Sequence, residues 1–254
     1  PEEGRSPLAD LAAVRSQEIG GVVPPQLERW QVGKADRLRP EHPLRIRFEA
    51  LLRAVGGDAA CGLYLSPVER ALAVEPTAPP AVVVGGAVAE DRFLLARLAW
   101  SLAERNFFLH QLPVAEVASI LGAAVQLHEP AFEGLGPVDA ALSKKLGKLL
   151  SRRSRRAVEE AARAIAAEPA PWDAAAFVDA VRQGADRIGL LLCGDLGAAL
   201  EALLAEEAPG LRPDDRAARE TALGRSRRAL ALVAWATGED HLFLRRRLGS
   251  ALGG

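Results

Sequence analysis

The segments of this chain that favour β-strands all lie within residues 61–84. Cys61–Leu65, Ala71–Val74 and Ala81–Val84 are short and rich in apolar and β-branched residues. Four prolines separate them, and Gly85-Gly86 ends the third. That third segment, AVVV, is apolar throughout, which is typical of a strand covered on both faces. We therefore expect one small three-stranded sheet in a fold that is otherwise helical.

The composition favours helices in the rest of the chain. Hydrophobic residues make up 49% of the 254 residues and aromatic residues only 5%, so Ala, Leu and Val must fill the core. Ala, Leu, Arg and Glu are abundant and are good helix formers. Apolar spacing predicts helices at residues 44–55, 90–105, 114–127, 138–167, 172–184, 187–192, 196–206, 214–237 and 239–252. The predicted class is mostly α (α+β).

The chain divides into three predicted regions. Residues 1–43 contain prolines and glycines that break long helices, and they predict an N-terminal arm lying over the domain. Residues 44–206 form the predicted core, and residues 207–254 a helical pair packed on it. In the last helix we expect the apolar residues 241–244 and 248 to pack inward while the arginines stay in water.

Two segments resemble motifs of HExxH zinc endopeptidases. In that class a helix after a strand carries two histidines at i and i+4 that hold zinc, and the intervening glutamate is the general base. In the prenyl-protein and heat-shock branch, the third ligand opens an ExxAD motif on a later helix. Here DRFLLARLAWSLAER, which follows Ala81–Gly86, resembles the zinc helix. RQGADRIGLLLCGDLGAALEALL, at residues 182–204, resembles the ExxAD helix and the segment after it.

The resemblance implies a site without its ligands. It places Arg97 and Ser101 at the two histidine positions, Leu98 at the glutamate and Arg182 at the third ligand. A guanidinium has only donors and cannot coordinate zinc, and leucine cannot accept a proton. The implied protein is a pseudoenzyme with no metal and no cofactor. Asp186 alone remains of the motif's charged positions, and we expect it to hold a helix terminus or to pair with Arg97.

A second resemblance bears on context. The stretch LLLCGDL and the ending HLFLRRRLG are similar to C-terminal modules of large myxobacterial proteins that carry tetratricopeptide-like repeats. This resemblance implies a bacterial context and a repeat domain of the same or another chain as the partner. Together with the replaced positions Arg97, Leu98, Ser101 and Arg182, it predicts a cytoplasmic, non-catalytic interaction or structural module. The alternative to the zinc-endopeptidase resemblance is an unrelated α-rich domain. In such a domain the two segments quoted for that resemblance are ordinary packed helices. Because the sequence contains no methionine, we expect it to be part of a longer or processed protein.

A dense basic cluster gives a second function hypothesis. Seven basic residues fall within thirteen positions: Lys144, Lys145, Lys148, Arg152, Arg153, Arg155 and Arg156. Such a cluster can bind nucleic-acid backbone or anionic lipid, although the formal charge of −1 gives no global attraction. Because the cluster lacks aromatic residues, it disfavours single-stranded nucleic acid. The alternative is a solvated helix face over a buried leucine stripe.

Other familiar sites are missing from the sequence. Cys61 and Cys193 are far apart, which excludes a disulfide framework and a CxxC zinc site, and we expect two buried thiols. The four histidines form no HxxxH or HxH pair, and neither a GxSxG elbow nor a phosphate-binding loop occurs. No apolar run approaches the ~20 residues that span a bilayer. A hydrolase with an unrecognised site is the third hypothesis.

Overall fold

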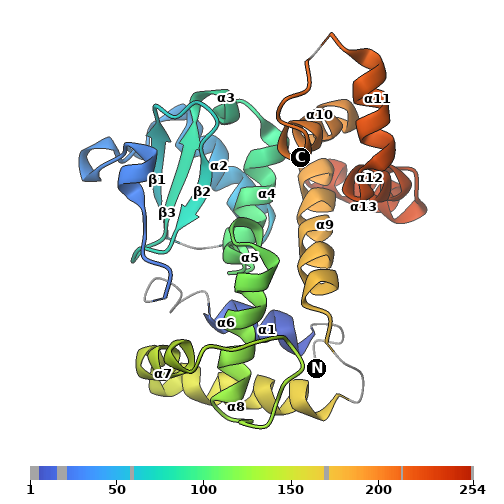
Figure 1. Cartoon of the computed structure of the whole chain (residues 1–254). Helices are drawn as coiled ribbons and strands as arrows, with labels where there is room; N and C mark the ends of the chain where they lie inside the picture. The colour runs from blue at the N-terminus through green and yellow to red at the C-terminus, as the bar shows by residue number, and fades with distance from the viewer. Residues whose placement is uncertain (1–5, 16–21, 58–59, 169–171, 213, 253–254) are drawn as a thin grey trace.

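The structure, a computed structural model, describes residues 6–15, 22–57, 60–168, 172–212 and 214–252. It is mostly helical with one small sheet, which confirms the predicted α+β class (Figure 1). The α-helices are α1 (Pro7–Arg15), α2 (Pro43–Ala54), α3 (Gly86–Ala89), α4 (Arg92–Ala103), α5 (Phe108–Gln111), α6 (Val114–Gln126), α7 (Ala140–Leu149), α8 (Arg152–Ala167), α9 (Ala174–Cys193), α10 (Leu196–Glu207), α11 (Arg216–Arg225), α12 (Arg227–Ala236) and α13 (Glu239–Leu252). Two short 3₁₀ helices, η2 (Leu27–Trp30) and η3 (Lys34–Asp36), precede α2.

The sheet has three strands in the order β1-β3-β2. They are β1 (Gly62–Ser66), β2 (Leu72–Glu75) and β3 (Ala81–Gly85), each within one residue of the predicted bounds. The central strand β3 pairs parallel with β1 and antiparallel with β2. The sheet is therefore mixed, and both β1 and β2 are edge strands.

The central strand is buried on both faces, as its apolar sequence predicts. Val82 and Val84 face the main core together with α2 and α4, while Val83 belongs to a second cluster on the opposite face. Tyr64 and the partly buried Trp30 of η2 pack in that second cluster. Because strand side chains alternate between faces, β3 needs a cover on each side. The helices supply one cover and the segment before α2 supplies the other.

The described part of residues 1–43 includes a helix of the core as well as the predicted arm. Leu8 and Leu11 of α1 are fully buried, and α1 packs on α8 and α6. Only the later part lies over the sheet, where the buried Glu75 accepts hydrogen bonds from Gln26 N at 2.7 Å and Trp30 Nε1 at 2.6 Å. A helix as short as α1 contains too few apolar residues for their spacing to distinguish a core helix from an irregular segment.

Several predicted helix boundaries are wrong. The predicted helix 138–167 divides before Ser151, whose side chain accepts a hydrogen bond from Ser154 N at 3.1 Å and caps α8. Ser226 likewise divides 214–237 and caps α12, so residues 207–254 contain three helices instead of a pair. A serine that caps a new helix competes with continuation of the old one. Conversely, the two helices predicted at 172–184 and 187–192 are a single helix, α9, which begins at Ala174 and ends at Cys193.

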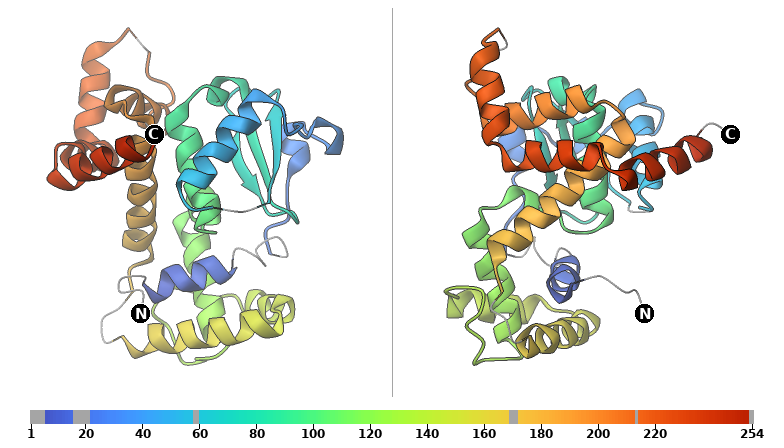
Figure 2. Two further views of the ribbon diagram at one scale, coloured as in Figure 1. Left: turned by 180° about the vertical axis from the view of Figure 1, so that it is seen from behind. Right: turned by 90° about the vertical axis from the view of Figure 1, so that its right-hand side faces the viewer.

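The helices form two groups joined through α4 and α9. Figures 1 and 2 show α4 beside the sheet with α9 along it, α6, α7, α8 and α1 at one end, and α10 to α13 at the other. Among the described residues, none of the helices has the length and apolar character needed to cross a bilayer. The pair α4–α9 is thus the centre of the fold.

The end of β3 has room only for glycine at position 85. A Cβ at Gly85 would lie 2.2 Å from the carbonyl oxygen of Val68 and 2.3 Å from that of Glu69, whereas a Cβ at Gly86 would meet nothing. We expect Gly85→Ala to lower the free energy of unfolding by about 2–3 kcal/mol. The adjacent control, Gly86→Ala, should change it by no more than about 0.5 kcal/mol. Urea unfolding followed by circular dichroism measures both, and equal effects would contradict the contact.

Candidate functional site

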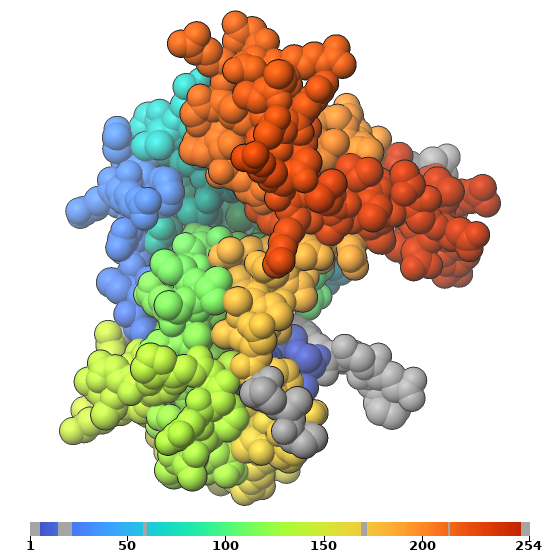
Figure 3. Space-filling view, turned by 45° about the vertical axis from the view of Figure 1, so that its right-hand side comes forward, coloured from blue at the N-terminus to red at the C-terminus, as the bar shows by residue number. Residues whose placement is uncertain are grey.

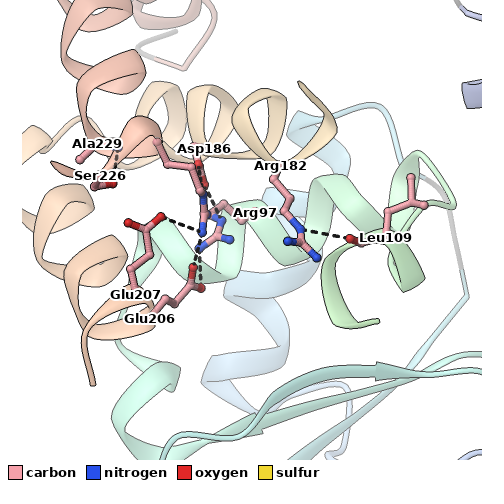
Figure 4. A network of polar contacts seen from close by, with 9 residues as sticks. Arg97, Leu109, Arg182, Asp186, Glu206, Glu207, Ser226 and Ala229 are labelled. Carbon is pink, nitrogen blue, oxygen red and sulfur yellow. Dashed lines mark hydrogen bonds and ion pairs between the residues drawn. The ribbon is translucent and has the colours of Figure 1, made fainter. Parts of the chain in front are cut away.

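The helices that carry the resemblance pack against each other. Gly189 of α9 lies against α4, where an added Cβ would be 2.8 Å from both the Phe93 ring and Arg97 Cγ. The absence of a side chain at Gly189 allows the two helices to approach closely. One turn before Gly189, Asp186 therefore comes within reach of Arg97 (Figure 4).

Four charged side chains from four helices form a closed ring, which we call the ion ring. Arg97 Nε of α4 lies 3.0 Å from Asp186 Oδ1 of α9, and this ion pair confirms the predicted pairing. Arg228 of α12 donates to both oxygens of Asp186, at 2.8 and 2.9 Å. Glu206 of α10 closes the ring, accepting from Arg97 Nη1 at 2.7 Å and from Arg228 Nη1 at 3.1 Å.

The ion ring is balanced in charge and is most deeply buried at Asp186 and Arg97, whereas the side chains of Arg228 and Glu206 are 17% and 33% exposed. The side chain of Asp186 is 1% exposed and that of Arg97 is 10% exposed. Burial raises the pKa of Glu206, but attraction to Arg97 and its hydrogen bond outweigh this, so the pKa stays below its usual value. Burial likewise opposes the charge of Arg228, while its hydrogen bonds to Asp186 hold its pKa above the ordinary range. The pairing therefore favours the charged forms of Glu206 and Arg228.

The remaining positions of the resemblance have structural contacts. Leu98 is buried in the main core. Ser101 is 3% exposed, and its Oγ donates to the Leu98 carbonyl oxygen at 2.9 Å. Arg182 donates to the carbonyl oxygens of Leu109 and Leu112, both at 3.2 Å, and so satisfies the C-terminal end of α5. Burial, followed by the nearby Arg228, lowers the pKa of Arg182.

A cleft opens next to the ion ring. It has a volume of about 690 Å³ and lies between β2, α3 and α4 on one side and α10 and α11 on the other. The carboxylates that line it are all engaged. Glu206 belongs to the ion ring, Asp91 accepts from Leu94 N at 3.0 Å, and Glu201 pairs with Arg219.

The basic cluster lies far along the chain from the ion ring, on α7 and α8, and all of its seven side chains are exposed. Arg155 donates to the Gly147 carbonyl oxygen at 3.2 Å, and Arg156 pairs with Glu160 at 3.1 Å. The other five have no ion pair or hydrogen bond with the described part of the chain. Four arginines lie at the N-terminal end of α8, where the helix dipole disfavours positive charge.

The histidines and cysteines do not assemble a metal site. Within the described residues, no group of three or more His, Cys, Asp or Glu side chains could hold a metal ion. His110 packs edge-on against Trp100, and burial together with Arg97 and Arg182 lowers its pKa to about 3. Cys61 is buried and Cys193 partly buried, both as free thiols whose pKa is raised by burial.

Two members of the ion ring were not identified from the sequence. Arg228 lies in a basic run and Glu206 in an acidic helix end, so each resembles an ordinary surface residue. Spacing gives a weak signal, because Arg228 follows the cap Ser226 and precedes the buried Ala229 of an amphipathic helix. That signal predicts a partly buried arginine but does not reveal its partner.

The ion ring makes the stability of the fold sensitive to one carboxylate. We expect Asp186→Asn to lower the free energy of unfolding by about 3–5 kcal/mol, because it removes the most deeply buried carboxylate and leaves Arg97 and Arg228 with Glu206 and, for Arg228, the more distant Glu207. The control Glu160→Gln breaks the exposed pair with Arg156 and should cost less than about 0.5 kcal/mol. Urea unfolding of both variants gives the comparison. A loss below about 1 kcal/mol for Asp186→Asn would contradict a tightly coupled ring.

Comparison of the chain with family models, curated proteins and solved structures finds no match. The zinc-endopeptidase resemblance therefore depends only on the residues of the α4 and α9 segments quoted above. What these residues imply about function is a proposal.

Proposed function

We propose that this chain is a non-catalytic protein-interaction or structural module on a scaffold related to zinc endopeptidases. One observation carries the proposal. Arg97 corresponds to a metal ligand in the resemblance, but its guanidinium forms ion pairs with Asp186 and Glu206 in the ion ring. A side chain held this way contributes to packing and cannot contact a substrate.

The other corresponding positions support the same conclusion. The peptidase mechanism needs a metal that polarises a carbonyl and a base that takes a proton from water. Leu98 supplies no proton acceptor, Ser101 is bonded within its own helix, and Arg182 satisfies the end of α5. The scaffold thus keeps the helix contact and replaces its chemistry with structural bonds.

The context that we propose is the cytoplasm of a bacterial cell, beside a repeat domain of the same or another chain. The free thiols Cys61 and Cys193 suit a reducing compartment. The proposed module needs no cofactor, and its role would be carried by surfaces instead of by a catalytic cleft.

Metal binding tests the proposal directly. We expect the chain, incubated with excess zinc and dialysed, to retain no stoichiometric zinc by elemental analysis and to leave unfolded casein uncleaved. A four-fold variant with Arg97→His, Leu98→Glu, Ser101→His and Arg182→Glu restores the ligand types and should bind about one zinc per chain.

A matched control for this variant keeps Arg182 and changes only the three α4 positions. It retains an i, i+4 histidine pair but lacks the third ligand, so its zinc affinity should be lower. Stoichiometric zinc in the unaltered chain, or casein cleavage by it, would overturn the pseudoenzyme proposal. If both variants bind zinc equally, the relation between α4 and α9 differs from that of the peptidase scaffold.

A second candidate function is binding of nucleic-acid backbone or anionic lipid by the basic cluster. The arginines at the start of α8 favour it, because their charges oppose the helix dipole, and two of them, Arg152 and Arg153, have no ion pair or side-chain hydrogen bond with a described residue. A bound phosphate would relieve this repulsion, since helix N-termini and arginines both attract anions. Two probes separate the sources of phosphate: duplex DNA and vesicles containing phosphatidylserine.

We expect binding to one of these probes that weakens steeply as salt concentration rises. Arg152→Glu combined with Arg153→Glu should lower the affinity and reduce the salt slope by about 1 for each phosphate that the variant no longer neutralises. The control pair, Arg225→Glu with Arg227→Glu, makes the same charge change at exposed arginines of other helices. Binding that is absent or independent of salt, or an equal decrease in both pairs, would exclude the cluster as an anion site.

A further inference from the structure

The last helix, α13, is attached to the rest of the protein by few contacts. His241 Nδ1 lies 2.8 Å from the Ala236 carbonyl oxygen, and Arg245 donates to the Leu191 carbonyl oxygen at 2.8 Å. Leu248 packs partly against the main core. Figures 2 and 3 show α13 projecting from the body of the molecule. The helix is therefore held along one side and leaves the opposite side in water.

Three consecutive apolar side chains of α13 are exposed, against expectation. Leu242, Phe243 and Leu244 were expected to pack inward, but they are 50%, 57% and 40% exposed. Among the described residues, eight large apolar side chains are exposed, and five of them lie on α12 and α13. Exposed apolar residues gathered in this way mark an interaction surface more often than a solvated helix.

The free side also has an ordered pattern of charge. Glu239, Leu242, Phe243 and Arg246 follow i, i+3, i+4, i+7 spacing and so share one face of the helix. All four are exposed, and Arg247 lies over the Phe243 ring at 5.2 Å. Neither Glu239 nor Arg246 has an ion pair with a described residue. The face thus has an acid at its start, an apolar centre and a base at its end.

We propose that this face binds the same face of a second copy of the chain. In an antiparallel pairing about a two-fold axis, Leu242 of each copy meets Phe243 of the other. Glu239 of each copy then lies opposite Arg246 of the other, because the two pairs are equally spaced about the centre. A two-fold interface requires such self-complementarity, and this face has it in both apolar character and charge.

Other occupants fit the face less well. A parallel copy would place Arg246 beside Arg246, and a uniformly acidic helix would repel Glu239. An anionic membrane would also meet Glu239 and Asp240 at the start of the same helix. One helix pair buries less than the ~1,600 Å² of a standard interface, so the dimer should dissociate on dilution. The pairing goes beyond the proposed function and does not depend on it.

Reversing the charge of Glu239 or Arg246 tests the proposed antiparallel pairing of two α13 helices. We expect sedimentation velocity of the whole chain to show a monomer–dimer equilibrium. Glu239→Arg alone places arginines against arginines, and Arg246→Glu alone places glutamates against glutamates, so each should raise the dimer dissociation constant about tenfold or more. An equimolar mixture of the two variants restores both pairs, and it should dimerise about as well as the unaltered chain.

Two controls make the result specific. Asp240→Arg makes the same charge change in the same helical turn but off the shared face, so it should affect dimerisation less. Circular dichroism of each variant checks that α13 remains folded. A monomer at all concentrations, a dimer insensitive to Glu239→Arg, or a mixture that fails to recover would overturn the proposal. These outcomes are independent of zinc binding, so the two proposals can fail separately.

Discussion

The buried pairing of two arginines with two carboxylates fixes how the helices of this protein meet. Asp186 receives Arg97 from one side and Arg228 from the other, and Glu206 joins the two guanidiniums. Removing charges from water costs several kcal/mol for each ion, and only closely matched partners offset that cost. The arrangement of α4, α9, α10 and α12 is consequently restricted to the one in which all four side chains reach each other.

Charged residues that have partners inside the protein differ in role from charged residues on the surface that have none. Inside the protein, the ion ring and Arg182 use the charges near the α4–α9 contact for packing or capping. On the surface, five residues of the basic cluster and the two charged residues of the free face of α13, Glu239 and Arg246, have no ion pair with a described residue. Unpaired charges at a helix N-terminus and exposed apolar side chains both reduce stability, and the two binding surfaces that we propose consist of such residues.

Much of the fold could be predicted from local pattern, and the errors have local causes. The strands were found because proline and glycine bound short apolar segments, and each lies within one residue of its predicted place. Ser151 and Ser226 were overlooked as helix caps because serine is tolerated inside helices as well. The inward packing of residues 242–244 was wrong because three consecutive helical residues point to different sides, and only one side of α13 meets the core.

The sequence by itself determined that Arg97, Leu98 and Arg182 can neither hold zinc nor accept a proton from water, because coordination and proton transfer depend on side-chain chemistry. It also supported the pairing of Asp186 with Arg97. Only the tertiary structure decided that Arg228 and Glu206 complete the ion ring. Arg97 and Glu206 are 109 residues apart and Asp186 and Arg228 are 42 apart, and helical periodicity carries no information over such separations. Close packing of α4 on α9 at Gly189, and of α10 and α12 around them, brings these charges together.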